Sequence, residues 1–251
     1  MTTLGIDLAA EPRDTGGCAI EWTRDAATVQ WVSTGLDDEE ILHRARAADV
    51  VGIDAPFGWP SCFVEAISAH HAGRKWPVEA WEKASRRRLR LRVTDERVHQ
   101  VTEKLTPLSV SSDAIAIPAS RCAWLLDRLE VSDRSGGRVQ EVYPAAALFQ
   151  WGLRHKAYKG RENVRSLEEL LTSLRKRTPW LTISARDEEL LATCDDAFDA
   201  LVASLIARAA ARELTLRPEA GEREAARVEG WIALPHRGSL EKLCLSPPVT
   251  I

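Results

Sequence analysis

The sequence predicts an α/β protein built on a mixed β-sheet flanked by helices. Three observations lead to this fold class. The first 56 residues read as strand, strand, strand, helix and strand. Two apolar segments, LGIDL at 4–8 and VVGID at 50–54, share the tripeptide Gly-Ile-Asp. A late segment, 195–213, carries an apolar stripe at helical spacing. A helix between the third and fourth strands allows the fourth strand to lie parallel beside the first.

The N-terminal elements follow from local patterns. Residues 3–8 predict the first strand, and the β-rich segments 17–23 and 28–35 predict a hairpin across a short polar turn. Residues 36–50 predict a helix, because acidic residues occupy its first turn and arginines lie near its end, as the helix dipole favours. Residues 50–56 are apolar, which is typical of a strand that is buried on both faces.

The later elements are less regular. Residues 57–135 contain prolines, tryptophans, helical patches and a basic run, and we interpret them as an insertion between the fourth and fifth strands. Residues 136–144 predict a short fifth strand, because β-forming residues end at a proline. Residues 145–213 predict mostly helix, and residues 225–235 predict a late strand.

The composition restricts the class of protein. With 251 residues, 45% hydrophobic and 28% charged, the chain is expected to fold into a sizeable core. It has no apolar run approaching ~20 residues and no secretory signal pattern, so we expect a cytoplasmic protein without a membrane span. Five scattered cysteines without a CxxC pair favour reduced thiols. A net charge of −3 excludes a globally basic protein, although residues 86–92 and 153–165 are strongly basic.

The two Gly-Ile-Asp segments predict a pair of neighbouring carboxylates. Strand side chains alternate between faces, so Gly5 and Asp7 share one face of the first strand, and Gly52 and Asp54 share one face of the fourth. If these strands are parallel neighbours, the two aspartates stand side by side, and each glycine leaves room beside its carboxylate. Adjacent carboxylates repel unless a proton or a cation lies between them, and Mg²⁺ and Mn²⁺ prefer such oxygens.

The late helix and the fifth strand offer further acids. Asp196 and Asp199 are three residues apart on the predicted helix 195–213, so they share part of one helix face. Asp199 lies at the edge of the apolar stripe and is expected to face the sheet. Asp195 is expected to cap the N-terminus of the helix. Glu141, on the fifth strand, is another candidate.

Several motifs together resemble a known family. GIDLA, GIDAP and DAFDAL are similar to the acidic constellation of the ribonuclease H-like superfamily, and the D-x-x-D-A pattern resembles the late helix of Holliday-junction resolvases. With LRVTDERV, EVYPAA, YKG and EGWI, they resemble domain of unknown function 429, whose members are predicted nucleases of this fold. The resemblance implies one ribonuclease H-like domain over 1–251, with the insertion at about 57–135 and a five-stranded sheet of order 3-2-1-4-5.

The resemblance also assigns residues. Asp7 matches the first-strand metal ligand, Asp54 the fourth-strand acid, and Asp196 and Asp199 the acids of the late helix. Other residues match motifs of the family to which no role is attached: Arg92, Asp95, Glu141, Tyr143 and Lys159.

These assignments predict metal-dependent hydrolysis of phosphodiesters in nucleic acid. The expected cofactor is two Mg²⁺ or Mn²⁺ ions held by Asp7, Asp54, Asp196 and Asp199, with Asp7 bridging them. Glu141 is included among the catalytic carboxylates. Arg92 and Lys159 are expected to neutralise phosphate oxygens, and the basic runs to hold the flanking backbone. The sequence does not distinguish between DNA, RNA and small nucleotides as substrates. It is also compatible with a homo-oligomer.

Two other functions are compatible with the sequence. A non-catalytic binding or regulatory protein on the same fold is favoured by the negative net charge and by four tryptophans between the fourth and fifth strands: Trp59, Trp76, Trp81 and Trp124. An actin-like or sugar-kinase-like nucleotide-binding protein also places an aspartate after Gly-Ile on the first strand. Such proteins need two domains and a glycine-rich phosphate loop, for which the SGG sequence at 135–137 is a poor candidate.

Overall fold

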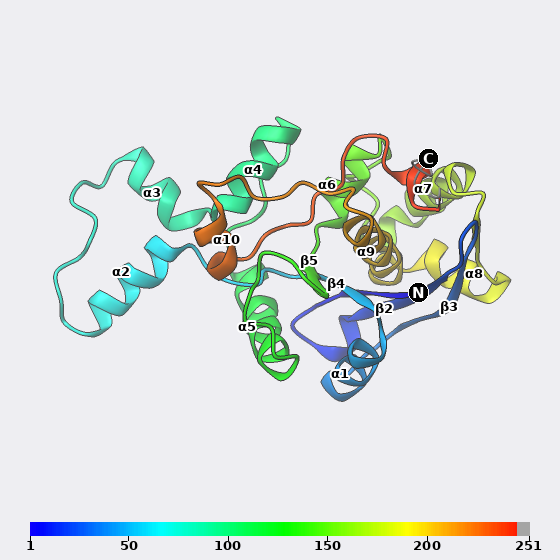
Figure 1. Ribbon diagram of the computed structural model, residues 1–251, viewed down its shortest axis with the longest axis horizontal. Coiled ribbons are helices and arrows are strands. Elements are labelled where there is room, and N and C mark those ends of the chain that lie inside the picture. The colour runs from blue at the N-terminus through cyan, green and yellow to red at the C-terminus, as the bar shows by residue number, and fades with distance from the viewer. Residues whose placement is uncertain (245–251) are drawn as a thin grey trace, which may run out of the picture.

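A computed structural model describes residues 1–244 and consists of one mixed sheet covered by helices on both faces (Figure 1). The sheet has six strands in the order β5-β4-β1-β2-β3-β6. The central strands β1, β2 and β3 are antiparallel, whereas β4 is parallel to β1, β5 to β4 and β6 to β3. The strands are β1 (Thr2–Asp7), β2 (Gly16–Trp22), β3 (Ala27–Thr34), β4 (Val50–Asp54), β5 (Val139–Glu141) and β6 (Leu181–Thr182).

Ten α-helices accompany the sheet within residues 1–244. They are α1 (Asp38–Ala47), α2 (Ser61–His71), α3 (Lys83–Arg90), α4 (Val93–Thr102), α5 (Asp113–Arg128), α6 (Pro144–Gln150), α7 (Val164–Arg177), α8 (Ala185–Thr193), α9 (Asp195–Ala211) and α10 (Arg223–Glu229). Four of them, α2 to α5, lie between β4 and β5, in the segment interpreted as an insertion. Within the described residues, no helix combines the length and the apolar character that crossing a bilayer requires.

The structure corrects three expectations about the elements. The sheet has six strands, not five, because Leu181 and Thr182 pair with the start of β3, and two residues are too few to leave a periodic pattern. The first five residues of the late strand expected at 225–235 belong to α10, which ends at Glu229, and among the others only Ile232 bridges to β5. Residue Cys194, not Asp195, is the N-cap of α9. The remaining α/β order agrees with the expectation.

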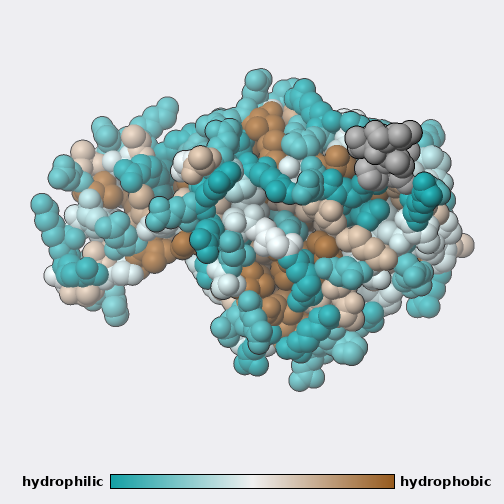
Figure 2. All heavy atoms as spheres, viewed as in Figure 1, coloured by the Kyte–Doolittle hydropathy of each residue, from teal (hydrophilic) through white to brown (hydrophobic). Residues whose placement is uncertain are grey.

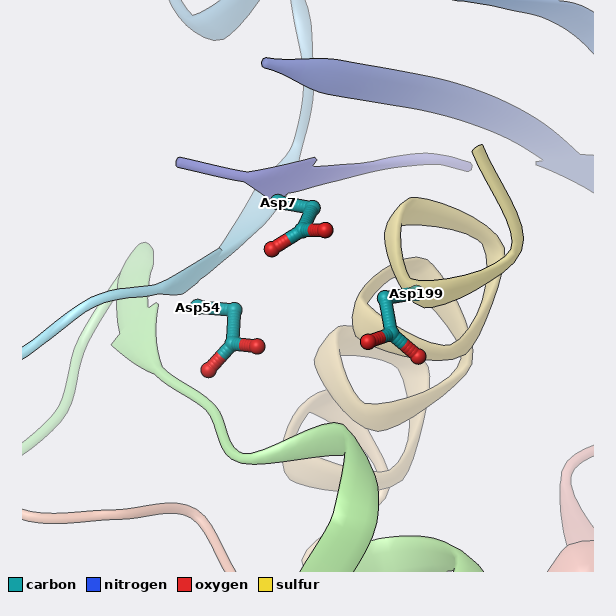
Figure 3. A group of neighbouring side chains, drawn as sticks. All are labelled: Asp7, Asp54 and Asp199. Atoms are coloured by element: carbon teal, nitrogen blue, oxygen red, sulfur yellow. The ribbon is translucent and has the colours of Figure 1, made fainter. Parts of the chain in front are cut away.

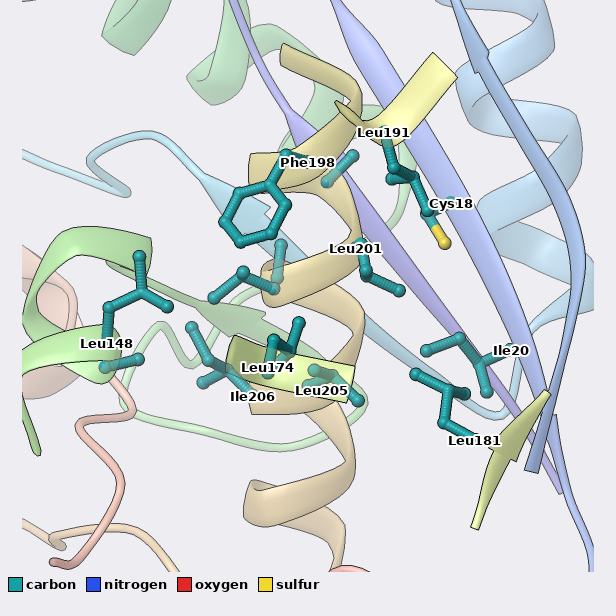
Figure 4. Close-up of a cluster of buried hydrophobic side chains, with 14 of the residues drawn as sticks. Cys18, Ile20, Leu148, Leu174, Leu181, Leu191, Phe198, Leu201, Leu205 and Ile206 are labelled. Atoms are coloured by element: carbon teal, nitrogen blue, oxygen red, sulfur yellow. The ribbon is translucent and has the colours of Figure 1, made fainter. Parts of the chain in front are cut away.

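Two apolar cores lie on the two faces of the sheet. On one face, α9 packs with α6, α7 and α8, and its residues Phe198, Leu201 and Leu205 point into this core (Figure 4). On the other face, α1 and α5 cover the sheet through residues such as Ile41 and Leu125. Because most of α9 is buried, its polar residues Asp199 and Ser204 lie inside the protein.

Glycines on β1 and β4 allow α9 to lie very close to the sheet. A Cβ atom on Gly5 would collide with the backbone of Ala200 and Ser204, and one on Gly52 would lie 2.6 Å from the oxygen of Ala203. The sequence interpretation gave this space to the carboxylates, but in the structure the helix backbone fills it. The glycines therefore position α9, and with it Asp199, against the ends of β1 and β4.

We expect Gly5→Ala to destabilise the protein by at least about 3 kcal/mol, at the upper end of overpacking effects, because the added methyl group meets backbone atoms that side-chain rotation cannot move. Chemical denaturation measures this change. Gly136→Ala is the matched control, because a Cβ atom there meets nothing within 4 Å. Equal stability of the two variants would contradict the close approach of α9.

Candidate functional site

Three aspartates from three elements meet at one end of the sheet. The parallel register of β1 and β4 pairs Asp7 directly with Asp54, one at the end of each strand. Asp199 reaches the same place from the second turn of α9 (Figure 3). One carboxylate oxygen from each aspartate lies within 4.8 Å of the others. This register confirms the prediction, made from the alternation of side chains along each strand, that Asp7 and Asp54 are neighbours.

A buried polar network fixes the helix that carries Asp199. The hydroxyl groups of Thr3 on β1 and Ser204 on α9 are 2.8 Å apart, and the Ser204 hydroxyl also donates to the Thr3 carbonyl oxygen. The indole N–H of Trp22 donates to the Thr3 hydroxyl at 2.8 Å. These hydrogen bonds satisfy polar groups that would otherwise be costly to bury, so they set the position of α9 along β1.

Two residues of the YKG motif hold the Asp199 carboxylate. The Tyr158 hydroxyl donates to Oδ1 of Asp199 at 2.9 Å, and the Lys159 ammonium lies 2.5 Å from Oδ2. Tyr158 is buried, whereas the side chain of Lys159 is 54% exposed, so the lysine stem runs along the surface while its charged end reaches the acids. The Lys159 ammonium thus lies beside the three carboxylates, where it can also contact an anionic ligand.

The cluster is electrostatically unfavourable without added positive charge. Burial, and then the nearby Asp199 carboxylate, raise the pKa of Asp7 well above its usual range. Burial also raises the pKa of Asp54 to about 7, although Lys159 opposes the shift. For Lys159, burial lowers the pKa but the three carboxylates more than compensate and hold it above its usual value. One ammonium therefore faces three carboxylates, an arrangement that favours binding of a cation.

The other predicted site residues have different surroundings. Asp196 is half-buried beside the cluster but does not belong to the group of three, and burial raises its pKa to about 6. Glu141 and Arg92 form a buried ion pair, with Oε1 of Glu141 2.7 Å from the guanidinium. The guanidinium of Arg92 also contacts Asp95 at 2.9 Å. Its hydrogen-bonding groups are committed to protein atoms, so the expected role of Arg92 in binding phosphate is not supported by the structure.

Glu229 is a structural partner that the sequence interpretation missed. Its carboxylate accepts hydrogen bonds from the backbone N–H of Ser61 at 2.8 Å and of Val93 at 2.9 Å. The only signal for it was its place in the EGWI motif. Glu141 similarly accepts a hydrogen bond from the backbone N–H of Phe57 at 3.0 Å. Both glutamates therefore hold backbone segments in place, and of the two only Glu141 also lines the pocket that contains Asp54.

The carboxylates form one wall of a pocket of about 480 Å³. An apolar part of the lining, here called the apolar wall, comes from the segment before α5 and from its first turns, including Leu108, Ile115 and Pro118. The sequence gives no periodic signal for this wall, because part of it lies in the irregular segment before α5. The SGG sequence at 135–137 lines a separate pocket, away from the carboxylates. The site thus combines an acidic wall with an apolar wall.

We expect Mg²⁺ or Mn²⁺ to stabilise the protein near neutral pH. An ion present at 100 times its Kd would add about 2.7 kcal/mol to the free energy of unfolding, which raises the melting temperature by roughly 5–10 °C.

Asp54→Asn should raise the melting temperature of the metal-free protein, because it removes one repelling charge, and should abolish the response to the metal. Differential scanning calorimetry with and without chelator measures both effects. Asp127→Asn, an exposed change on α5, should behave as the parent does.

Comparison with known proteins gives one match. The family model described as "Protein of unknown function (DUF429)" matches residues 5–223. This range contains Asp7, Asp54 and Asp199, and it confirms the family resemblance seen in the motifs. No curated protein and no solved structure matches the chain.

Proposed function

We propose that this chain, which belongs to the DUF429 family, hydrolyses phosphodiester bonds of nucleic acid with the help of divalent metal ions. The observation that carries the proposal is the convergence of Asp7, Asp54 and Asp199, whose oxygens lie within 4.8 Å of one another. The strand order within the sheet, with two parallel strands beside an antiparallel meander, supports a ribonuclease H-like fold as part of the same proposal.

The donor set fits a hard divalent cation. Asp7, Asp54 and Asp199 offer only carboxylate oxygens, which Mg²⁺ and Mn²⁺ prefer, and their mutual repulsion is relieved by positive charge. Asp196, one turn earlier on α9, is the fourth carboxylate that we assign to the site. The proposal is that these four carboxylates hold two divalent ions. Divalent ions bound there would lower the pKa of water and stabilise charge on a leaving oxygen.

The residues around the cluster have distinct parts in this proposal. Tyr158 orients the Asp199 carboxylate through its hydroxyl group. Lys159 lies at the rim of the cluster, and its ammonium can move from Asp199 to a phosphate oxygen of the substrate, where it stabilises negative charge. The apolar wall at Leu108 and Ile115 gives a base or sugar a surface to pack against and excludes water from one side.

One observation favours the alternative of a non-catalytic nucleic-acid-binding protein. The ammonium of Lys159 already lies among the carboxylates and pairs with Asp199 at 2.5 Å. A lysine in such a place can replace a metal ion as the balancing charge. In this alternative the cluster is a structural ion pair, and metal ions neither bind tightly nor promote cleavage.

A cleavage assay tests the proposal. The protein is incubated with end-labelled single-stranded DNA, duplex DNA, branched DNA and single-stranded RNA, with Mg²⁺ or Mn²⁺, and in parallel with chelator. We expect cleavage of at least one substrate that requires the metal. If calorimetry shows that the metal binds but no substrate is cleaved, the proposed hydrolysis is refuted although the metal site stands. If the metal does not bind, the metal centre itself is refuted and the non-catalytic alternative is favoured.

A further inference from the structure

The segment between β4 and α4 projects from the body of the protein. Residues 60–90, here called the arm, contain α2 and α3 and extend to one side, away from the sheet (Figure 1). The arm follows Asp54 closely in the chain, since α2 begins at Ser61. Its surface combines hydrophilic side chains with apolar patches (Figure 2). A projecting element next to an acidic cluster is well placed to contact a ligand that extends beyond the pocket.

The arm is basic although the chain is not. Residues 60–90 contain seven Lys and Arg residues and three Glu residues, whereas the whole chain has a net charge of −3. Helix α3 contains no acidic residue. Only Arg87 among these cations forms an ion pair, with Glu96, in the part of the chain that the structure describes. The six others are exposed and have no ion pair there: Arg74, Lys75, Lys83, Arg86, Arg88 and Arg90. This concentration of unpaired positive charge favours a polyanion.

Exposed apolar groups accompany the charges. The side chain of Trp81, just before α3, is 67% exposed. Val64 and Ile67 on α2 are also exposed, at 48% and 46%. An exposed indole among cations is suited to single-stranded nucleic acid, because its unpaired bases can stack on the ring while the phosphates meet the arginines. In a duplex the bases are already stacked, so the indole would have no such partner.

The base of the arm is fixed to the site. One carboxylate, that of Glu229, accepts hydrogen bonds from Ser61 at the start of the arm and from Val93 just after its end. Arg92 adds ion pairs to Glu141, which lines the same pocket as Asp54. Both ends of the arm are therefore anchored beside the carboxylate cluster, so a strand held by the arm is led toward the pocket.

We propose that the arm binds single-stranded nucleic acid through its exposed arginines and Trp81, and directs the strand toward the cluster of Asp7, Asp54 and Asp199. The destination of the strand depends on the proposed function, but binding by the arm does not. The two can thus fail separately: binding is measured in chelator, where no metal-dependent cleavage takes place.

The first test reverses charge on the arm. Fluorescence anisotropy with a labelled single-stranded oligonucleotide in chelator compares the parent with Arg86→Glu/Arg88→Glu/Arg90→Glu. We expect the variant to lose at least tenfold in affinity, and the salt dependence of log K to fall by roughly 2, as expected for the loss of about three phosphate contacts. The matched control, Arg46→Glu/Arg186→Glu/Arg217→Glu, changes the net charge equally on exposed positions of the body and should lose less than threefold. Unchanged circular dichroism and melting temperature verify folding. Equal losses in both triple variants, or none in the arm variant, overturn the proposal.

The second test concerns the indole. Trp81→Ala should weaken binding of the single strand about tenfold, within the range reported for one base stack. Trp124→Ala, which removes another exposed tryptophan, on α5, should leave binding within twofold of the parent. Duplex of the same sequence and vesicles containing phosphatidylserine are measured in parallel. Tighter binding of the single strand than of either competitor supports the proposal. Equal binding of the duplex, or binding of the vesicles in place of the strand, overturns it.

Discussion

Asp7→Asn is expected to abolish metal-dependent cleavage while leaving the protein folded. Asp7 pairs with Asp54 across the two strands, and one of its carboxylate oxygens lies within 4.8 Å of oxygens of Asp54 and of Asp199 on α9. An amide removes the negative charge and one of the oxygens that could bind the ion. We expect a loss of at least ~10³-fold in kcat, which corresponds to about 4 kcal/mol of transition-state stabilisation. The reaction is measured under single-turnover conditions with the best substrate of the cleavage assay.

The fold should gain stability from the same substitution. Burial and the Asp199 charge oppose ionisation of Asp7, so a neutral side chain of the same shape is easier to bury. The melting temperature of the metal-free variant should therefore rise, although its activity is lost. Asp127→Asn serves as the control and should alter neither quantity. Cleavage by Asp7→Asn within tenfold of the parent would refute the proposed role of this residue.

The positions of Asp7 and Asp54 could be predicted because they depend on local rules. Alternation along each strand placed Gly5 and Asp7 on one face, and the helical crossover made β1 and β4 parallel neighbours. The register then pairs Gly5 with Gly52 and Asp7 with Asp54, as the repeated tripeptide suggests. What the repeat did not reveal is the function of the glycines. Their space is occupied by the backbone of α9, which lies about 150 residues after Gly52 and about 200 residues after Gly5 in the chain.

The choice between the acids on α9 could be predicted only in part. The spacing of Asp196 and Asp199 treats them alike, and only the place of Asp199 at the edge of the apolar stripe indicated that it faces the sheet. In the structure, Asp199 is buried against the sheet and Tyr158, whereas Asp196 lies half-buried at the helix start. The surroundings of Arg92 could be predicted even less well from the sequence. Its sequence context is that of a free cation near a basic run, and only folding brings it against Glu141, which lies far along the chain.

Arg92→Met is expected to destabilise the protein by about 3–5 kcal/mol, the range measured when one partner of a buried ion pair is removed. Arg92 is 1% exposed, and its guanidinium donates to Asp95, to Glu141 and to the Glu229 carbonyl oxygen. Methionine fills similar space but leaves the two carboxylates buried without a cation. The melting temperature should fall by roughly 6–20 °C. Arg97→Met is the matched control, since Arg97 pairs with Glu222 near the surface, and it should cost less than about 1 kcal/mol.

The loss in Arg92→Met should also depend on pH in a defined direction. Burial raises the pKa of Glu141, and in the parent the charge of Arg92 opposes this shift. Without Arg92 the pKa of Glu141 in the folded state moves further above its unfolded value of about 4.3. A group with a raised folded pKa contributes its full stability below the unfolded pKa and loses it as the pH rises through the folded pKa. The difference between parent and variant should thus be smaller near about pH 5 than near about pH 8. A pH-independent difference would mean that lost packing, rather than an unpaired Glu141 carboxylate, causes the destabilisation. The anchor at the base of the arm would then not depend on the charge of Arg92.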